Sequence, residues 1–155
     1  MKYQLAQINV GRLRYPAEDA RLAEFMNNLE LVNGIAESTP GFVWRLKDDS
    51  GNATHIHAYE DPQIIVNMSV WKSIEALQLF AYRGEHVQFF RRRAEWFEDF
   101  GGPSMALWWI EAEKFPSAAQ GREKLEYLTK HGITREAFTF REKFSAPDIE
   151  FTQIP

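Results

Sequence analysis

The stretch from Ser69 to Phe97 constrains this chain most, because the spacing of apolar residues changes at its start. Over residues 66–70, apolar and polar side chains alternate, which is the two-residue period of a β-strand. From Ile74 onward, apolar residues recur every three or four positions, which is typical of a helix. The sequence therefore predicts a strand that leads directly into a helix, with Ser73 as the N-cap.

Gly84 interrupts this helix, and a second apolar stripe follows it. The stripe begins at Val87 and ends at Phe97, and its spacing predicts a second helix. His86 and Arg93 share a neighbouring face of that helix, because they lie about two turns apart. The pair is therefore a candidate for chemistry at the helix surface.

The order of the remaining segments indicates the fold class. Alternation predicts strands, and three- or four-residue spacing predicts a helix that ends before Pro40 and another that follows a capping box at Ser117. The order strand, helix, strand, strand, helix, strand is the split βαβ, ferredoxin-like arrangement. We expect one α+β domain over residues 1–155, with an antiparallel sheet and an extra C-terminal helix and arm. The predicted strands cover residues 2–10, 42–46, 54–59, 66–71, 105–110 and 137–144.

One face of this sheet presents a problem of exposure. The two helices of the split βαβ unit cover one face, and the other face is too apolar to be left in water. Pairing with a second copy would bury it, so we expect a homodimer of the dimeric α/β-barrel type. This expectation depends on no other part of the chain covering that face.

Charge and composition exclude several classes of function. The 155 residues carry a formal net charge of -4, which disfavours general nucleic-acid binding. No segment approaches the ~20 apolar residues that a membrane-spanning helix needs. The chain contains no cysteine, so thiolate metal sites and cysteine nucleophiles are absent. We expect a cytoplasmic protein with neither membrane nor nucleic-acid partners.

Polar and aromatic side chains alternate onto one face of the predicted strands. By alternation these side chains point away from the helices, into a cavity on the other face of the sheet. Amides, a cation and large rings are the mixture found in pockets for polar aromatic ligands. The alternative is that the polar groups satisfy one another or line a wet dimer seam. The predicted ligand-binding residues are Gln7, Asn9, Arg45, Asn67, Ser69, Trp71 and Trp108, with Trp109 replacing Trp108 if the register slips by one residue.

His86 is the candidate general base, because imidazole titrates near neutral pH. Arg93 is the candidate for holding a developing oxyanion. The alternative for His86 is a structural role, in which it caps the break at Gly84 or packs between helices.

A second histidine pattern, His55-x-His57, has the spacing of a metal pair on a strand. With His86 or Glu60 it could complete a three-ligand site. No carboxylate stands at a diagnostic spacing, however, so an exposed edge strand is the other interpretation and no metal is assigned.

Five runs of residues resemble a known family. The runs PGFVWRL (40–46), SVWKSIEALQLFAYRGEH (69–86), RAEWF (93–97), ALWWI (106–110) and AFTF (137–140) resemble the domain-of-unknown-function family 3291. That family is similar to the dimeric α/β-barrel superfamily, which includes antibiotic-biosynthesis monooxygenases, haem-degrading monooxygenases and small isomerases. The resemblance implies the barrel dimer and no particular activity.

Haem and other cofactors are not expected. Haem-degrading relatives use an asparagine, a tryptophan and a histidine, and Asn9 matches the asparagine. Ala76 stands near the position where the tryptophan would fall, three helical turns before the histidine. This departure argues against haem degradation.

The sequence leads to two hypotheses for function. The first is a cofactor-independent, monooxygenase-like or isomerase-like enzyme that acts on a small aromatic or polyketide-type substrate. In it His86 removes a proton, Arg45 and Asn67 hold the oxyanion, and Trp71 stacks on the ring. The second is a dimeric module that binds a ligand or a partner without catalysis.

Overall fold

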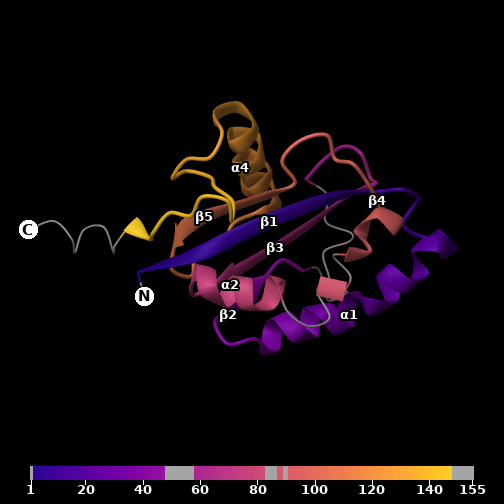
Figure 1. The fold of residues 1–155 in the computed structure, drawn as a ribbon, viewed down its shortest axis with the longest axis horizontal. Coiled ribbons are helices and arrows are strands. Elements are labelled where there is room, and N and C mark those ends of the chain that lie inside the picture. Colours follow the sequence, from indigo (N-terminus) through magenta and orange to yellow (C-terminus); the bar gives the residue numbers. More distant parts are fainter. Residues whose placement is uncertain (1, 48–57, 83–86, 89–90, 148–155) are drawn as a thin grey trace, which may run out of the picture.

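A five-stranded antiparallel sheet forms the centre of the protein (Figure 1). The computed structural model describes residues 2–47, 58–82, 87–88 and 91–147. The central strand β1 (Tyr3–Leu13) pairs with β3 (Ile64–Trp71) on one side, and with β5 (Met105–Glu111) and then β4 (Phe97–Glu98) on the other. Strand β2 (Phe42–Arg45) pairs with the outer edge of β3. This order is ferredoxin-like, so the predicted α+β fold class is confirmed.

Two helices lie on one face of the sheet, as the split βαβ pattern predicts. Helix α1 (Ala23–Ser38) follows a 3₁₀ turn, η1 (Ala20–Leu22), and connects β1 to β2. Helix α2 (Ile74–Ala81) begins directly after β3. The hydroxyl of Ser73 accepts a hydrogen bond from the Ala76 backbone N–H at 3.1 Å, so the predicted N-cap is confirmed.

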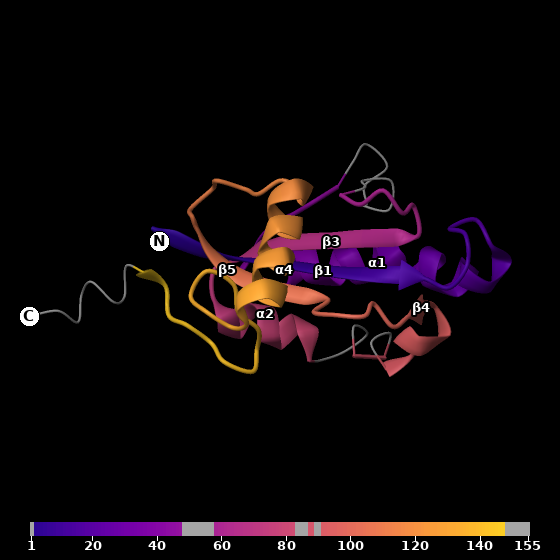
Figure 2. The same cartoon turned by 90° about the horizontal axis from the view of Figure 1, so that it is seen from above.

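A third helix, α4 (Ala118–His131), covers the opposite face. Figures 1 and 2 show α4 on one side of the sheet and α1 on the other. Leu125 and Leu128 of α4 are buried against the even-numbered side chains of β1, β3 and β5. Gly121 brings the helix close, because a Cβ there would lie 2.7 Å from Ile8 Cδ1 and 3.0 Å from Met68 Sδ.

The position of α4 corrects one premise of the sequence analysis. The apolar face that was expected to need a second copy is covered by the extra helix of the same chain. Burial of that face supplies the same apolar free energy whether the cover comes from the same chain or from a partner. The homodimer stays a prediction, but an uncovered sheet face no longer supports it.

Two further segments differ from their predicted forms. The helix expected to reach Phe97 gives way to a 3₁₀ turn, η2 (Arg93–Glu95), and Phe97 pairs with Leu13 as part of β4. Residues 137–144 form isolated bridges instead of a strand, and the Phe138 backbone exchanges both hydrogen bonds with Leu107. Of the strand expected over residues 54–59, residues 54–57 lie outside the described part of the chain, and residues 58 and 59 are not in a strand.

Candidate functional site

A cavity of about 1190 Å³ lies between the sheet and helices α1 and α2. Odd-numbered residues of β1 and β3 form its floor, and the inner faces of α1 and α2 form part of its walls. This cavity was expected on the face away from the helices, and that placement is wrong. The physical reason is α4, which occupies the other face.

Part of the inner face of helix α1 lies over this cavity, although Ala36 and Phe25 pack against the sheet. Ala36 is the only residue of α1 that is buried, although the helix carries a stripe of apolar side chains on its inner face. Phe25, Leu29 and Val32 belong to that stripe, line the cavity and are only half-buried. An amphipathic helix normally buries such a stripe in the core. The space beneath α1 is therefore suited to an apolar ligand.

A ladder of polar side chains runs along the floor of the cavity. Gln7 is paired with Ser69, and Asn9 with Asn67, across β1 and β3. Gln7 Nε2 donates to Asn67 Oδ1 at 2.9 Å and to Ser69 Oγ at 2.8 Å. Asn9 Nδ2 donates to Gln7 Oε1 at 3.1 Å. The ladder begins at Trp71, whose Nε1 donates to Ser69 Oγ at 2.8 Å.

The ladder determines which way the Asn67 amide faces. Because Oδ1 of Asn67 accepts from Gln7, its Nδ2 must point away from that side chain. Ser69 Oγ accepts from both Gln7 and Trp71, so its hydroxyl hydrogen is available to donate. Within the described residues, neither of these two donors is bonded to protein. Both residues line the cavity, so the floor offers N–H and O–H donors to a ligand.

Arg45 reaches this face because of a β-bulge. The register of β2 against β3 shifts between Phe42 and Trp44, so Arg45 lies opposite Ser69. Its Nε donates to Glu37 Oε1 at 2.8 Å, and its side chain is only 12 % exposed. This hydrogen bond holds the pKa of Glu37 below its ordinary value. Arg45 therefore lines the cavity on the face of α1 and α2, with Glu37 as one of its partners.

The two predicted tryptophans do not line the cavity. Trp71 is completely buried, stacked on Phe80 at 5.5 Å and edge-on to Phe42 at 5.4 Å, so it cannot stack on a ligand. Trp108 lies on the opposite face in the core beneath α4. Both positions follow from burial, since large rings settle into the core.

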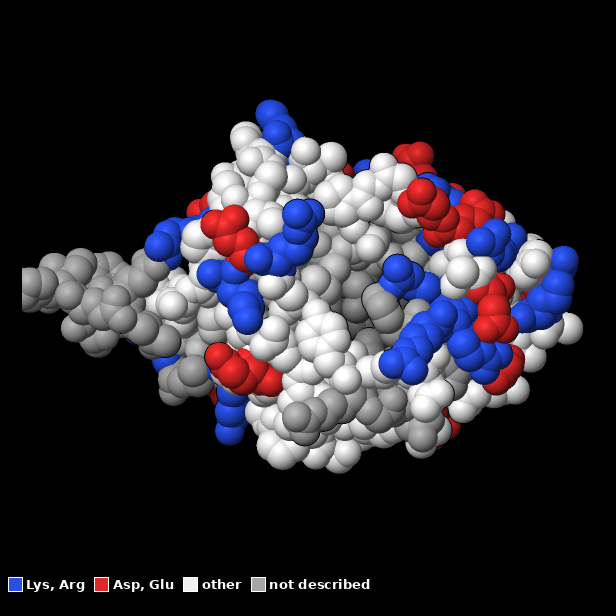
Figure 3. All heavy atoms as spheres, in the orientation of Figure 1, with Lys and Arg blue, Asp and Glu red and all other residues white. Residues whose placement is uncertain are grey.

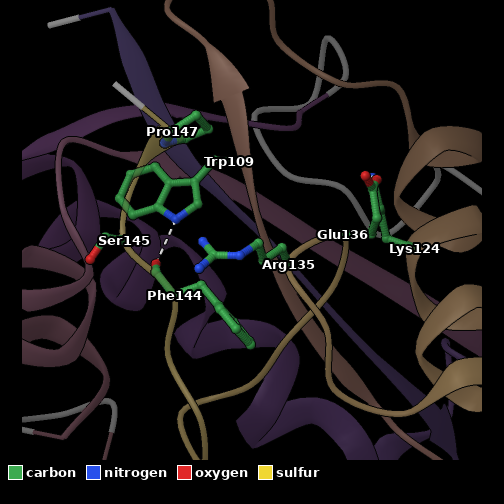
Figure 4. Close-up of a pocket in the computed structure, with 7 residues that line it drawn as sticks. All are labelled: Trp109, Lys124, Arg135, Glu136, Phe144, Ser145 and Pro147. Carbon is green, nitrogen blue, oxygen red and sulfur yellow. Dashed lines mark hydrogen bonds and ion pairs between the residues drawn. The ribbon is translucent and has the colours of Figure 1, made fainter. Parts of the chain in front are cut away.

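Trp109 faces the same side as Leu5 but lines a different, smaller pocket of about 280 Å³ (Figure 4). Its Nε1 donates to the carbonyl oxygen of Phe144 at 2.8 Å. Arg135 packs its guanidinium over the Phe144 ring at 5.2 Å. These contacts join the C-terminal segment to the edge of β5.

The structure describes Arg93, one of the two predicted catalytic residues, but not the three predicted histidines. Arg93 lines the large cavity from η2. His86, His55 and His57 lie outside the described residues, so their roles stay predictions. Among the residues that the structure describes, no cluster of three histidine or carboxylate side chains could hold a metal ion.

Two further arginines at the cavity were not predicted from the sequence. Arg14 follows the end of β1, and Arg91 precedes η2; both line the cavity. Figure 3 shows Lys and Arg side chains gathered beside a hollow in the surface that faces the viewer. No periodicity reports them, because they come together only when the segment before β4 folds against the end of β1. Their positions place two cationic groups on the wall of the cavity.

An ion-pair cluster ties this segment to α1. Arg92 donates to both carboxylate oxygens of Glu24 and to both of Glu95, and its guanidinium lies 4.9 Å from the Trp96 ring centroid. The hydrogen bonds from Arg92 hold the pKa values of Glu24 and Glu95 below their ordinary value of 4.5. Because a lowered pKa means that the folded state favours the ionised form, the cluster stabilises the fold above that value.

This stabilisation should be lost as the pH falls below 4.5 and through the lowered pKa values. We expect Arg92→Gln to reduce the loss of stability on acidification from about pH 5 to about pH 3. Without the arginine, the carboxyl groups of Glu24 and Glu95 should titrate near the pKa values that they have in the unfolded chain. Urea unfolding at a series of pH values measures this. The exposed Arg141 serves as the matched control, as Arg141→Gln. An unchanged pH dependence in Arg92→Gln would contradict the role of the cluster.

Comparison with known proteins identifies the family. A model of the domain-of-unknown-function family DUF3291 matches residues 4–153, nearly the whole chain. The chain belongs to this family. The resemblance found in the sequence is thereby confirmed, and DUF3291 membership by itself assigns no reaction. A comparison with curated proteins finds no match.

Several solved structures are similar to this DUF3291 protein. A putative antibiotic biosynthesis monooxygenase from Nitrosomonas europaea is 10% identical, with a TM-score of 0.48, and the match covers 76% of this chain and 97% of that one. SnoaB, a cofactor-independent oxygenase from Streptomyces nogalater, is 13% identical, with a TM-score of 0.45 and coverage of 72% and 95%. The ActVA-Orf6 monooxygenase from Streptomyces coelicolor, solved with nanaomycin D, is 18% identical, with a TM-score of 0.43 and coverage of 74% and 93%.

One finding concerns the helices and the membrane. None of the helices formed by the described residues is both long enough and apolar enough to span a bilayer.

Proposed function

We propose that this protein binds a small aromatic molecule through an oxygen atom of that molecule. The observation that carries the proposal is the fixed direction of the Asn67 amide, whose N–H groups face a cavity with largely apolar walls. Ser69 places a hydroxyl donor beside it. A few oriented donors in an otherwise apolar cavity are the usual composition of a small-molecule site.

The same donors suit one kind of chemistry. When a proton is removed from a phenol or from a carbon beside a carbonyl, negative charge develops on the oxygen. Donors that are already oriented stabilise that charge without reorganising. We therefore propose a cofactor-independent reaction of the monooxygenase or isomerase type, with Asn67 and Ser69 holding the phenolate or enolate oxygen. His86 remains the predicted base.

A second candidate is a ligand-binding module without catalysis. The observation in its favour is that the described residues of the cavity wall include no histidine. The carboxylates among the described residues of that wall, Glu98 and Asp99, are exposed. Asp99 Oδ1 already accepts a hydrogen bond from the Gly101 N–H at 3.0 Å. Oxygen uptake and product analysis with hydroxylated naphthalenes and anthracenes separate the two, because a module binds these compounds without consuming oxygen and without converting them. The same assay with His86→Ala tests the predicted base.

The binding proposal is tested by Asn67→Asp. An aspartate keeps the oxygen that accepts from Gln7 but has no N–H to offer the cavity. For 2-acetylnaphthalene, whose only polar atom is an acceptor, we expect the Kd to rise at least about tenfold, the effect of losing one hydrogen bond and facing a carboxylate. Isothermal titration calorimetry measures the change.

Asn33→Asp is the matched control. Asn33 lines the cavity from α1, so this variant adds the same charge on another wall without touching the ladder. Its Kd should change less than that of Asn67→Asp. Equal affinity in wild type and Asn67→Asp, or no binding by wild type, would refute the binding proposal.

A further inference from the structure

Two arginines at the cavity wall have a cationic group with no carboxylate partner among the residues that the structure describes. Arg14 Nε donates to the Ala94 carbonyl oxygen at 2.6 Å, which fixes the side chain near the segment before β4. Within the described part of the chain, neither Arg14 nor Arg91 forms an ion pair. Both line the cavity that holds the amide ladder.

This lack of partners contrasts with other arginines in a chain of net charge -4. Carboxylates are plentiful, and several described arginines at other positions pair with one: Arg12, Arg21, Arg45, Arg92 and Arg122. A cationic wall in an acidic protein draws anions from solution toward it, because the local field, not the net charge, acts at short range.

The two carboxylates at the same cavity limit where an anion can lie. Glu98 lies opposite Arg12 in the pairing of β4 with β1, and Asp99 caps the turn at Gly101. An anion is repelled from that side, so the favourable position is next to Arg14 and Arg91. A ligand that places its charge beside Arg14 and Arg91 therefore avoids both carboxylates.

Building on the proposed function, we infer that the ligand is an aromatic anion held at two points. Its neutral acceptor oxygen lies at Asn67 and Ser69, and its anionic group, of the carboxylate kind, lies at Arg14 and Arg91. Asn9 is paired with Asn67, and Arg14 follows Asn9 by five residues, which is about 16 Å along an extended strand. A separation of this order is longer than a single ring and favours a ligand of two or three fused rings.

A matched pair of probes tests the second point of attachment. The first is 6-acetyl-2-naphthoate, which carries both the acceptor and the carboxylate, and the second is its uncharged methyl ester. We expect the wild-type protein to bind the acid about tenfold more tightly than the ester at low salt, the effect of one or two charged hydrogen bonds. The preference should shrink as salt is added, because the arginines are solvent-exposed.

Two variants test where the carboxylate of the probe binds. Arg14→Gln and Arg91→Gln should each reduce the preference for the acid and leave the affinity for the ester nearly unchanged. Arg141→Gln removes an exposed arginine elsewhere and should leave the preference intact. Circular dichroism confirms folding of each variant, and because Arg14 also bonds Ala94, Arg91→Gln provides the independent test.

The outcomes distinguish this inference from the proposed function. Equal binding of acid and ester by wild type, or a preference that survives both arginine variants, overturns the aromatic-anion inference alone. In that case, weaker binding of the ester by Asn67→Asp would still support the acceptor site. If neither probe binds wild type, the proposed function fails and this inference fails with it.

Discussion

Replacing Leu125 and Leu128 of α4 together with alanine is expected to lower the free energy of unfolding by about 5 kcal/mol, since each buried Leu→Ala change costs about 2–5 kcal/mol. Both side chains are buried against the sheet, where α4 covers the apolar face. Small domains have a total stability of about 5–15 kcal/mol, so the double variant should be close to unfolding. Urea unfolding measures the loss.

The controls use the outer face of the same helix. Glu123→Ala and Lys130→Ala change exposed residues and should alter the free energy of unfolding by less than about 0.5 kcal/mol. The double leucine variant should also self-associate, as light scattering would detect, because a partly released α4 exposes the sheet. A small loss of stability with no association would show that α4 does not cover this face in solution.

The molar mass of the wild-type protein completes this experiment. The homodimer predicted from the sequence would now need a surface other than the one that α4 covers. Light scattering on the wild-type protein gives this mass, and a monomer would contradict the predicted homodimer.

Replacing Gln7 with glutamate is expected to reverse the amide ladder. Gln7 is only 4% exposed, and its Nε2 supplies the hydrogen bonds that hold Asn67 Oδ1 and Ser69 Oγ. A carboxylate at this position can only accept, so the Asn67 amide should turn and present its oxygen to the cavity. Binding of 2-acetylnaphthalene should weaken at least about tenfold even though Asn67 is intact.

This variant should also be less stable, by about 2–4 kcal/mol at neutral pH, because a buried carboxyl group replaces a satisfied amide. Burial raises the pKa of the introduced carboxyl in the folded state, so the folded form binds its proton more tightly than the unfolded form does. The loss of stability should therefore be smaller at low pH and grow as the pH rises through that pKa. Calorimetric titration and urea unfolding at several pH values measure both effects.

Gln4→Glu is the matched control. Gln4 lies on the same strand, and its Oε1 accepts from the Glu113 N–H at 3.1 Å, a role that a glutamate oxygen can also fill. It should leave both stability and ligand affinity nearly unchanged. Unaltered ligand affinity in Gln7→Glu would mean that the orientation of Asn67 does not control binding.

Local patterns in the sequence determined most of the secondary structure and the membership of the ladder. Alternation places Gln7, Asn9, Asn67 and Ser69 on one face of β1 and β3, because successive side chains of a strand point to opposite faces. The caps at Ser73 and Ser117 were equally readable, since each depends on a side chain and an N–H three residues away.

The tertiary structure alone decided which face of the sheet carries the cavity. Alternation separates two faces but does not say which one a distant helix will cover, and α4 covered the face expected to be open. The bulge in β2 set the side of Arg45, and packing between Phe42 and Phe80 removed Trp71 from the site. Arg14 and Arg91 meet at the cavity only through long-range folding. Periodicity reports neighbours along the chain, whereas these features depend on contacts between segments far apart in it.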